Sequence, residues 1–488
     1  MKKSIFSGSG FFFLSVFVFL CLFPGFLFAQ KPFSKRALKK NLQALLDGLC
    51  MQEPGGNPAE TTPGFGAAVH YLGPPGKRLS GKKFFLVSGY SNPTDKCIGC
   101  PLKIKPDQLF ELGSTTKSTT AALALYYMGQ NVNLYGVPFT LDATIEELDP
   151  SIVGKDINGS VTVKQLLNMT SGIADFEEDI DYQWTVRPEL VLAQAEESDF
   201  ASMQIFELKQ RIMDMATRPP NPYNPIFGEP FDKNSPLRFW TPNDIYNYIP
   251  DPLFPPGTNW SYSNTNYVIS GQFIQGLVNF WDVTVGLEKH LWEPYQIKFY
   301  YGGYDFIPPP AMVFGWSYSG ENTADTSRIA FYSSYWTAGA LIGKPADLAR
   351  WGLALWSPEI EVIKPEYYAQ MLEFVDTGQN LYYSKRDPVP GIVNNGYGLG
   401  TMRVIVELEE DGRQVTLFGH NGKTRGFNSV VLYLPERQVA FSIVGNNGGS
   451  NTGKHDVIQL ERDFTRVLMS YAAPNYLRTP RIKEEDHP

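Results

Sequence analysis

Cysteine and histidine are scarce in this chain of 488 residues, which holds four cysteines and five histidines. The histidines are not spaced as metal ligands, and the cysteines lack the additional ligands or the βαβ context that a zinc or redox motif needs. We therefore expect neither a metal nor another cofactor.

A dense run of basic residues is also absent, and no apolar run of membrane-spanning length follows the N-terminal segment. The 42 Lys and Arg residues are outnumbered by 50 Asp and Glu residues, which gives a formal net charge of −8. This balance argues against nucleic acid or an anionic membrane as the main partner.

No G-x-S-x-G occurs, which excludes the usual nucleophile elbow of α/β-hydrolases.

The N-terminus reads as an export signal. Lys2 and Lys3 precede a Phe- and Leu-rich run over residues 11–22, and a Pro-Gly breaker leads to Ala29. Cleavage after Ala29 fits this pattern, whereas the uncleaved run is nearly long enough to anchor the chain. We expect residues 1–29 to be a signal peptide or an uncleaved anchor, and the protein to act in the periplasm or outside the cell.

Export permits disulfide formation. Cys21 lies in the signal, which leaves Cys50, Cys97 and Cys100. We predict one structural disulfide with one thiol left over, and the sequence leaves the pairing open.

The apolar pattern predicts a single α/β (α+β) domain over residues 30–478. Strands near both ends with helices between them indicate one antiparallel sheet assembled from the two termini. The sheet lobe would comprise residues 35–113 and 330–475, and a helical, partly irregular lobe would comprise residues 114–329. Helices are predicted at 34–51, 161–169, 267–278, 345–356 and 456–469, and strands at 65–71, 83–88, 397–407, 414–418, 428–434 and 438–445.

Residues 218–257 hold eleven prolines mixed with aromatic residues. Such a segment forms neither a regular helix nor a central strand. It is either an irregular surface loop or a rim that shapes a cleft, and the sequence leaves both alternatives open.

Residues 111–125 read as a turn followed by a helix whose first turn carries Ser114 and Lys117. Residues three apart share one helix face, so the lysine amine can lie beside the serine hydroxyl. A neighbouring base makes a serine hydroxyl nucleophilic, and S-x-x-K is a recognised arrangement for this. The spacing alone is weak, because an N-cap serine followed by an exposed lysine also fits. A second copy at residues 80–83 reads as a solvated turn.

Two later motifs add groups that suit the same chemistry. Residues 262–264 (Tyr-Ser-Asn) supply a phenol that can relay a proton and an amide that can bind a substrate carbonyl. Residues 420–422 (His-Asn-Gly) lie on a predicted strand, where small residues let a substrate approach. A buried tyrosine and a lone strand histidine are the ordinary alternatives. Another Tyr-x-Asn at residues 90–92 reads as a turn.

In this order, the three motifs resemble those of the serine β-lactamase/penicillin-binding protein superfamily. The similarity is greatest to its class C-related branch, which includes D-alanyl-D-alanine carboxypeptidases and family VIII-type esterases. It extends over residues 34–473 and implies a β-lactamase/transpeptidase-like fold. Four further stretches also resemble the family: residues 166–172 (LLNMTSG), 338–341 (AGAL), 347–349 (DLA) and 397–400 (YGLG).

The resemblance implies a catalytic role for each matched side chain. Ser114 would be the nucleophile that becomes acylated, and Lys117 and Tyr262 would share the work of the general base. Asn264 would orient the acyl carbonyl of the substrate. His420 would replace the lysine of the K-T-G form of the third motif.

The resemblance also implies groups that bind the substrate. The backbone N–H groups of Ser114 and Lys423 would form the oxyanion hole. Asn421 and Gly422 would line the substrate site, with Asn421 in place of the usual hydroxyl residue. Arg425 would either supply a compensating charge or be an exposed arginine at a strand end.

His420 affects the expected substrate, because histidine is mostly neutral at pH 7 and attracts a substrate carboxylate less than lysine does. We therefore predict an exported, esterase-like serine hydrolase that cleaves an ester or amide through an acyl-enzyme on Ser114. D-alanyl-D-alanine carboxypeptidase activity, weak β-lactamase activity and a non-catalytic cell-envelope binding protein are the alternatives. The expected partner is a small-molecule or peptidoglycan-type substrate, with no nucleic acid and with membrane contact only through residues 1–29.

Overall fold

The computed structural model describes the larger part of the chain: residues 30–93, 101–178, 240–278, 283–301, 312–316, 328–381, 389–409, 411–448 and 451–477, except 52, 54, 58, 59, 155 and 314. Within these residues, no helix combines the length and the apolar character needed to cross a bilayer. The predicted export signal and residues 218–239 lie outside them.

Cys50 is buried, and its Sγ atom lies 2.9 Å from the Ser88 hydroxyl oxygen. Cys97 and Cys100 lie outside the described residues. The disulfide therefore stays a prediction.

A nine-stranded antiparallel sheet joins the two ends of the chain, in the order β3-β2-β1-β14-β13-β12-β11-β10-β9. The two ends of the chain meet where β1 pairs with β14, and Tyr71 lies opposite Val439 in this pair. The predicted sheet built from both termini is confirmed. The strands are β1 (Gly64–Tyr71), β2 (Lys83–Asn92), β3 (Leu102–Lys103), β9 (Val375–Asp376), β10 (Ile392–Tyr397), β11 (Met402–Glu407), β12 (Gln414–Lys423), β13 (Asn428–Leu434) and β14 (Val439–Gly445).

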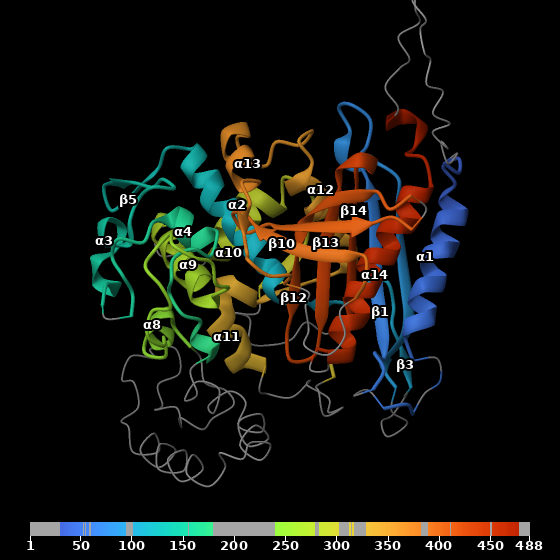
Figure 1. Cartoon of the computed structure of the whole chain (residues 1–488), viewed down its shortest axis with the longest axis horizontal. Helices are drawn as coiled ribbons and strands as arrows, with labels where there is room; N and C mark the ends of the chain where they lie inside the picture. Colours follow the sequence, from blue (N-terminus) through green and yellow to red (C-terminus); the bar gives the residue numbers. More distant parts are fainter. Residues whose placement is uncertain are drawn as a thin grey trace, which may run out of the picture.

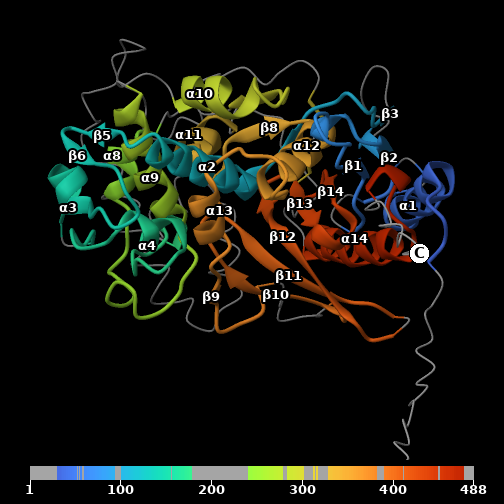
Figure 2. The same cartoon turned by 90° about the horizontal axis from the view of Figure 1, so that it is seen from above.

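Helices cover both faces of this sheet (Figures 1 and 2). Helices α1 and α14 pack on one face, and α12 packs on the other, next to the helical lobe. The described α-helices are α1 (Lys35–Leu49), α2 (Thr116–Gly129), α3 (Ile145–Leu148), α4 (Val163–Leu167), α8 (Pro242–Tyr246), α9 (Asn264–Leu277), α10 (Val283–Gly286), α11 (Arg328–Gly339), α12 (Pro345–Trp356), α13 (Pro365–Met371) and α14 (Asn451–Ser470).

Helix α2 lies where the helical lobe meets the sheet, in contact with α9, α11 and β12. Thirteen of its 14 residues are buried, and these include the five polar residues with which the helix begins. Small side chains at Ala121, Ala122 and Ala124 permit this close packing. The hydroxyl groups of its first turn bond back to the main chain, for example Thr119 Oγ1 to Thr116 O at 2.8 Å. The first motif is therefore held rigidly in the interior.

Two predictions of local structure are wrong: one strand and one turn. Residues 397–407 form a hairpin and not one strand, because the chain turns back between β10 and β11. In that turn Gly398 N donates to Thr401 O at 2.7 Å. Residues 90–92, predicted as a turn, complete β2 and pair with β3 across a register shift.

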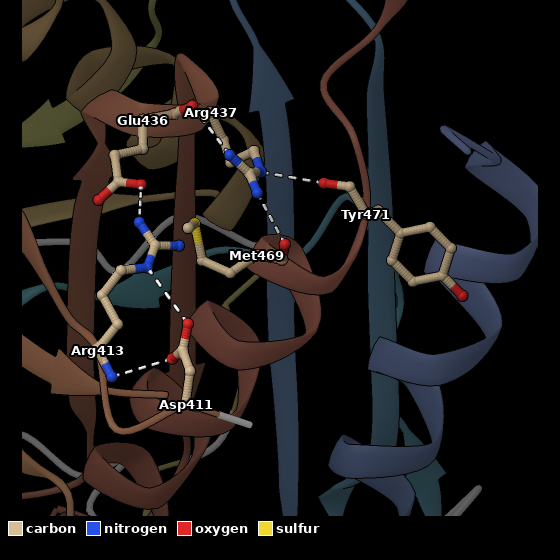
Figure 3. Close-up of polar contacts among 6 residues, drawn as sticks. All are labelled: Asp411, Arg413, Glu436, Arg437, Met469 and Tyr471. Carbon is tan, nitrogen blue, oxygen red and sulfur yellow. Dashed lines mark hydrogen bonds and ion pairs between the residues drawn. The ribbon is translucent and has the colours of Figure 1, made fainter. Parts of the chain in front are cut away.

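The end of α14 packs against the buried side chain of Arg437 (Figure 3). The guanidinium donates to Met469 O at 2.8 Å and to Tyr471 O at 3.0 Å. Carbonyl groups at a helix end carry partial negative charge and lack helical partners, so a buried cation satisfies them well. Arg413 lies nearby between Asp411 and Glu436, but its side chain is 47% exposed.

Arg437→Ala is expected to lower the free energy of unfolding by about 2–4 kcal/mol, because the carbonyls of Met469 and Tyr471 lose a charged, buried donor. Arg413→Ala is the matched control and is expected to cost less than about 1 kcal/mol, because its ion pairs are solvent-exposed. Urea unfolding followed by circular dichroism measures both. Equal losses of unfolding free energy in the two variants would contradict the role of Arg437 at the end of α14.

Candidate active site

Ser114 lies on the 3₁₀ turn η2 (Gly113–Thr115), immediately before α2. The residue before this turn is fixed by a hydrogen bond from Leu112 N to Leu341 O at 2.9 Å. Gly113 has a φ of +52°, and a Cβ atom there would lie 2.7 Å from Lys423 O. Only glycine therefore lets η2 approach the end of β12 so closely. This contact brings the first motif against the third.

The Lys117 side chain is fully buried, and its Nζ atom contacts three oxygen atoms. They are Ser114 Oγ at 3.0 Å, Asn264 Oδ1 at 2.6 Å and Ala338 O at 2.8 Å. A neutral amine has two N–H groups and one lone pair. The two carbonyl oxygens can only accept, whereas the serine hydroxyl can also donate. When Nζ is the neutral amine, its two N–H groups go to the carbonyl oxygens and its lone pair faces the Ser114 hydroxyl.

Burial lowers the pKa of Lys117 to about 7, although the carboxylates of Asp175 and Glu177 act in the opposite direction. Burial disfavours the charged form of any amine that leaves water. The neutral form that can accept a proton from Ser114 is therefore available close to neutral pH.

Tyr262 is half-buried, and it hydrogen-bonds the Ser114 side chain. Its ring centroid lies 4.9 Å from Lys117 Nζ. The loop that carries it is fixed by Ser261 N, which donates to Met169 O at 3.1 Å. Burial raises the pKa of Tyr262 well above its ordinary value, so the side chain is a neutral phenol at pH 7.

Two carboxylates lie behind Asn264, at the start of α9. Its Nδ2 atom donates to Asp175 Oδ2 at 2.9 Å and to Glu177 Oε2 at 3.0 Å, and its backbone N donates to Asp175 Oδ2 at 3.0 Å. Both amide protons therefore have acceptors within the protein. The resemblance implied that Asn264 orients a substrate carbonyl. In the structure its nitrogen bonds the two carboxylates and its oxygen bonds Lys117, and its role toward a substrate stays a prediction.

His420 is completely buried on β12. Its Nδ1 atom lies 2.5 Å from the Asn421 carbonyl oxygen, which can only accept, so Nδ1 carries the proton. Its Nε2 atom then accepts a hydrogen bond from the Tyr397 hydroxyl at 2.9 Å. Burial, with a contribution from the Lys117 charge, lowers the pKa of His420 to about 3. The imidazole is therefore neutral.

The other predicted residues lie at the end of β12. A Cβ atom on Gly422 would lie 2.9 Å from Ser114 N, so the backbone N–H group of Ser114 and this strand end are adjacent. Asn421 is half-buried, the Lys423 side chain is exposed, and Arg425 is half-buried in the connection to β13. The roles of these residues in an oxyanion hole and in substrate binding stay predictions.

Among the described residues, no group of three or more His, Cys, Asp and Glu could hold a metal ion. The polar side chains around Ser114 contact one another directly. The arrangement is that of an activated serine beside a buried amine and a neutral phenol, a set of groups suited to acyl transfer.

Comparison with known proteins identifies the family of the chain. A family model described as Beta-lactamase matches residues 81–225 and 243–465. The chain belongs to the beta-lactamase family.

Solved structures show the same fold. The chain is 21% identical to a D-stereospecific amidohydrolase from Streptomyces sp., over 86% of this chain and 98% of the other, with a TM-score of 0.57. It is 19% identical to a D-amino acid amidase from Ochrobactrum anthropi SV3 in complex with L-phenylalanine amide, over 89% and 98%, with a TM-score of 0.59. An octameric penicillin-binding protein homologue from Pyrococcus abyssi is 18% identical over 84% and 74%, with a TM-score of 0.52.

Sequence reasoning missed several groups that surround the motifs in this beta-lactamase-family site. Ala338 and Tyr397 belong to stretches that the resemblance had already indicated, and Asp175 follows a third such stretch by three residues. Those stretches were therefore a usable signal that the active site extends beyond the three motifs.

His420 is expected to stay neutral, with its proton on Nδ1, from about pH 5 to about pH 8, because its folded-state pKa lies well below the ordinary value of about 6.5. Imidazole ¹⁵N chemical shifts in long-range ¹H–¹⁵N correlation spectra measure both the charge and the tautomer. Tyr397→Phe removes the donor to Nε2 and should shift that nitrogen alone. Imidazolium shifts above about pH 5 would contradict the buried, neutral assignment.

Proposed function

We propose that this chain is a serine hydrolase that cleaves an ester or an amide through an acyl-enzyme on Ser114, with esterase-like activity. The observation that carries the proposal is the 3.0 Å contact between Ser114 Oγ and Lys117 Nζ, in which the remaining contacts of Nζ are carbonyl oxygens. This arrangement directs the lone pair of the neutral amine at the hydroxyl proton.

In the first step, Ser114 Oγ attacks the substrate carbonyl carbon, and its proton passes to Lys117 Nζ. The resulting ammonium keeps its hydrogen bonds to Asn264 Oδ1 and Ala338 O, so the new charge is solvated by oxygens already in place. A general base of this kind contributes about 10²–10⁴ in rate.

In the second step, the neutral phenol of Tyr262 donates its proton to the departing oxygen or nitrogen. Its raised pKa suits this acid role, because the phenol stays protonated at neutral pH. The proton held by Lys117 then passes to the Tyr262 oxygen, which restores the neutral amine and the neutral phenol. Water attacks the acyl-enzyme and gives a proton to Lys117, and that proton returns to Ser114 Oγ as the acid leaves.

The charges around the serine favour substrates without a carboxylate. His420 supplies no positive charge, and the half-buried Glu177 supplies a negative one beside Asn264. D-alanyl-D-alanine peptides and β-lactams carry a carboxylate, which such a site attracts poorly. These observations support an esterase-like activity over carboxypeptidase or β-lactamase activity.

A second candidate is an amidase whose substrate carries a positively charged amine. Glu177 favours it, because a half-buried carboxylate near the serine attracts a cation more strongly than an exposed one does. Two of the similar solved structures are named D-amino acid amidase and D-stereospecific amidohydrolase.

We also propose export to the periplasm or cell exterior, which the composition of residues 1–29 supports.

The purified protein is expected to hydrolyse p-nitrophenyl acetate and to react with a fluorophosphonate probe at Ser114. Ser114→Ala should abolish both reactions, and mass spectrometry of the labelled peptide identifies the site. Nitrocefin and a D-alanyl-D-alanine peptide should turn over more slowly than the ester. Faster release of ammonia from phenylalanine amide than hydrolysis of the ester would favour the amidase.

Ser118→Ala is a control for loss of a hydroxyl on the same helix outside the contact with Lys117. The Ser118 hydroxyl oxygen accepts from Trp351 Nε1 at 2.9 Å, so this change affects packing and not the nucleophile. Failure of every ester, amide and acylating probe to react with the wild-type protein would favour the non-catalytic binding protein.

The rate constant kcat/KM for p-nitrophenyl acetate is expected to rise with pH through about 7 and then level off, because Lys117 must lose its proton before it can act as the base. The rate rises with pH because the active form is the neutral amine, and that form predominates above the lowered pKa of Lys117. A pH–rate profile corrected for spontaneous hydrolysis tests this. A rising limb near pH 10, the ordinary value for lysine, would contradict it.

A further inference from the structure

The orientation of the Asn264 amide decides what Lys117 can do. An amide has an oxygen that accepts hydrogen bonds and a nitrogen that only donates them. With Oδ1 at 2.6 Å from Nζ, Asn264 takes an N–H bond from the amine and leaves the lone pair for Ser114. If the amide were turned over, Nδ2 would present a donor to the amine and compete for that lone pair.

Asp175 and Glu177 select the first orientation. Asp175 Oδ2 accepts from both Asn264 N and Nδ2, and Glu177 Oε2 accepts the second Nδ2 proton. A turned amide would place Oδ1 against two carboxylate oxygens, which repel it. Lys117 and the carboxylates therefore bind opposite ends of the same amide.

The segment that carries Asp175 is itself fixed to the start of α9. Ser263 Oγ and Thr265 Oγ1 donate to Ala174 O at 3.2 and 2.8 Å, and Phe176 N donates to Thr265 Oγ1 at 3.0 Å. The other carboxylate oxygen of Asp175 accepts from Glu177 N at 3.1 Å. The carboxylate is thus fixed both by its own bonds and by those of the chain around it.

We propose that Asp175 is a positioning residue for the base: its carboxylate holds Asn264 so that the lone pair of Lys117 faces Ser114. The inference rests on the proposed hydrolase function and extends it to a residue outside the three motifs. Asp175 acts through Asn264, with which it shares two hydrogen bonds.

The charged and titratable groups around Lys117 come from several elements. Asp175 lies just before η4 (Phe176–Glu178), and Glu177 lies within it. Tyr262 lies in the loop before α9, Tyr267 lies in the first turn of α9, and His420 lies on β12. Burial, with a contribution from Glu177, raises the pKa of Asp175 to about 7. Its negative charge raises the pKa of Lys117 in turn, so removal of that charge should move the rising limb of the rate to lower pH.

A double-mutant cycle tests the proposal, with the second-order rate of fluorophosphonate labelling at Ser114 as the readout. Asp175→Ala is expected to slow labelling about 10- to 100-fold, because a misplaced base loses much of its effect. At about pH 9, where Lys117 is neutral with or without the Asp175 charge, the same change in an Asn264→Ala background should have less than about a twofold effect, since Asp175 positions the base through that amide. Multiplicative effects of the two substitutions would overturn the proposal.

Asp175→Asn provides the conservative comparison, because its amide oxygen can still accept both bonds from Asn264. It should label at least about 10-fold faster than Asp175→Ala, with the rising limb of the pH profile at lower pH than in the wild type. Glu178→Ala is the matched control, because Glu178 is the exposed carboxylate that directly follows Glu177. This change should leave labelling unchanged. Thermal unfolding of each variant shows whether it folds.

The outcomes separate this inference from the proposed function. Labelling that Ser114→Ala leaves intact would disprove the function, and the inference would fall with it. Labelling that depends on Ser114 but is as fast in Asp175→Ala as in the wild type would overturn the inference alone. A uniform loss in both Asp175 variants, with the pH limb unmoved, would show a merely structural role and would also overturn it.

Discussion

The burial of one lysine amine is the constraint on which the site depends. Removing an amine from water is costly unless each of its bonding positions has a partner, and Lys117 finds one partner three residues away and two in distant parts of the chain. Asn264 lies 147 residues further along and Ala338 lies 221 residues further along. The fold must therefore hold α2, α9 and the end of α11 within hydrogen-bonding distance of one point.

The same burial determines the charge distribution around the serine. His420 is kept neutral by its surroundings, and two carboxylates approach the amine through an amide. His420 thus places a neutral imidazole where the family motif has a lysine, and Asp175 and Glu177 add negative charge nearby. The three sequence motifs did not indicate these two carboxylates. The proposed preference for substrates without a carboxylate therefore rests on electrostatics and not on shape.

The sequence predicted the general arrangement well, because periodicity and short motifs report which residues form helices and strands. The termini-built sheet and helix α12 follow from such patterns, as does the proximity of Ser114 and Lys117. The hairpin at residues 398–401 was missed, since apolar residues on both sides hid the turn. The partners of Asn264 and the tautomer of His420 could not be predicted either, because they depend on which groups pack around a side chain after folding.

The pairing of the first long strand with the last has a consequence for how the molecule is made. Gly64 N donates to the side chain of Asn446, 382 residues later. A growing chain on the ribosome already carries Ser114 and Lys117 while β12, β13 and β14 are still unsynthesised, and one edge of β1 stays open until they emerge. Ser114 and Lys117 are thus made early and the strand that carries His420 late, so the candidate site is complete only once nearly the whole polypeptide exists.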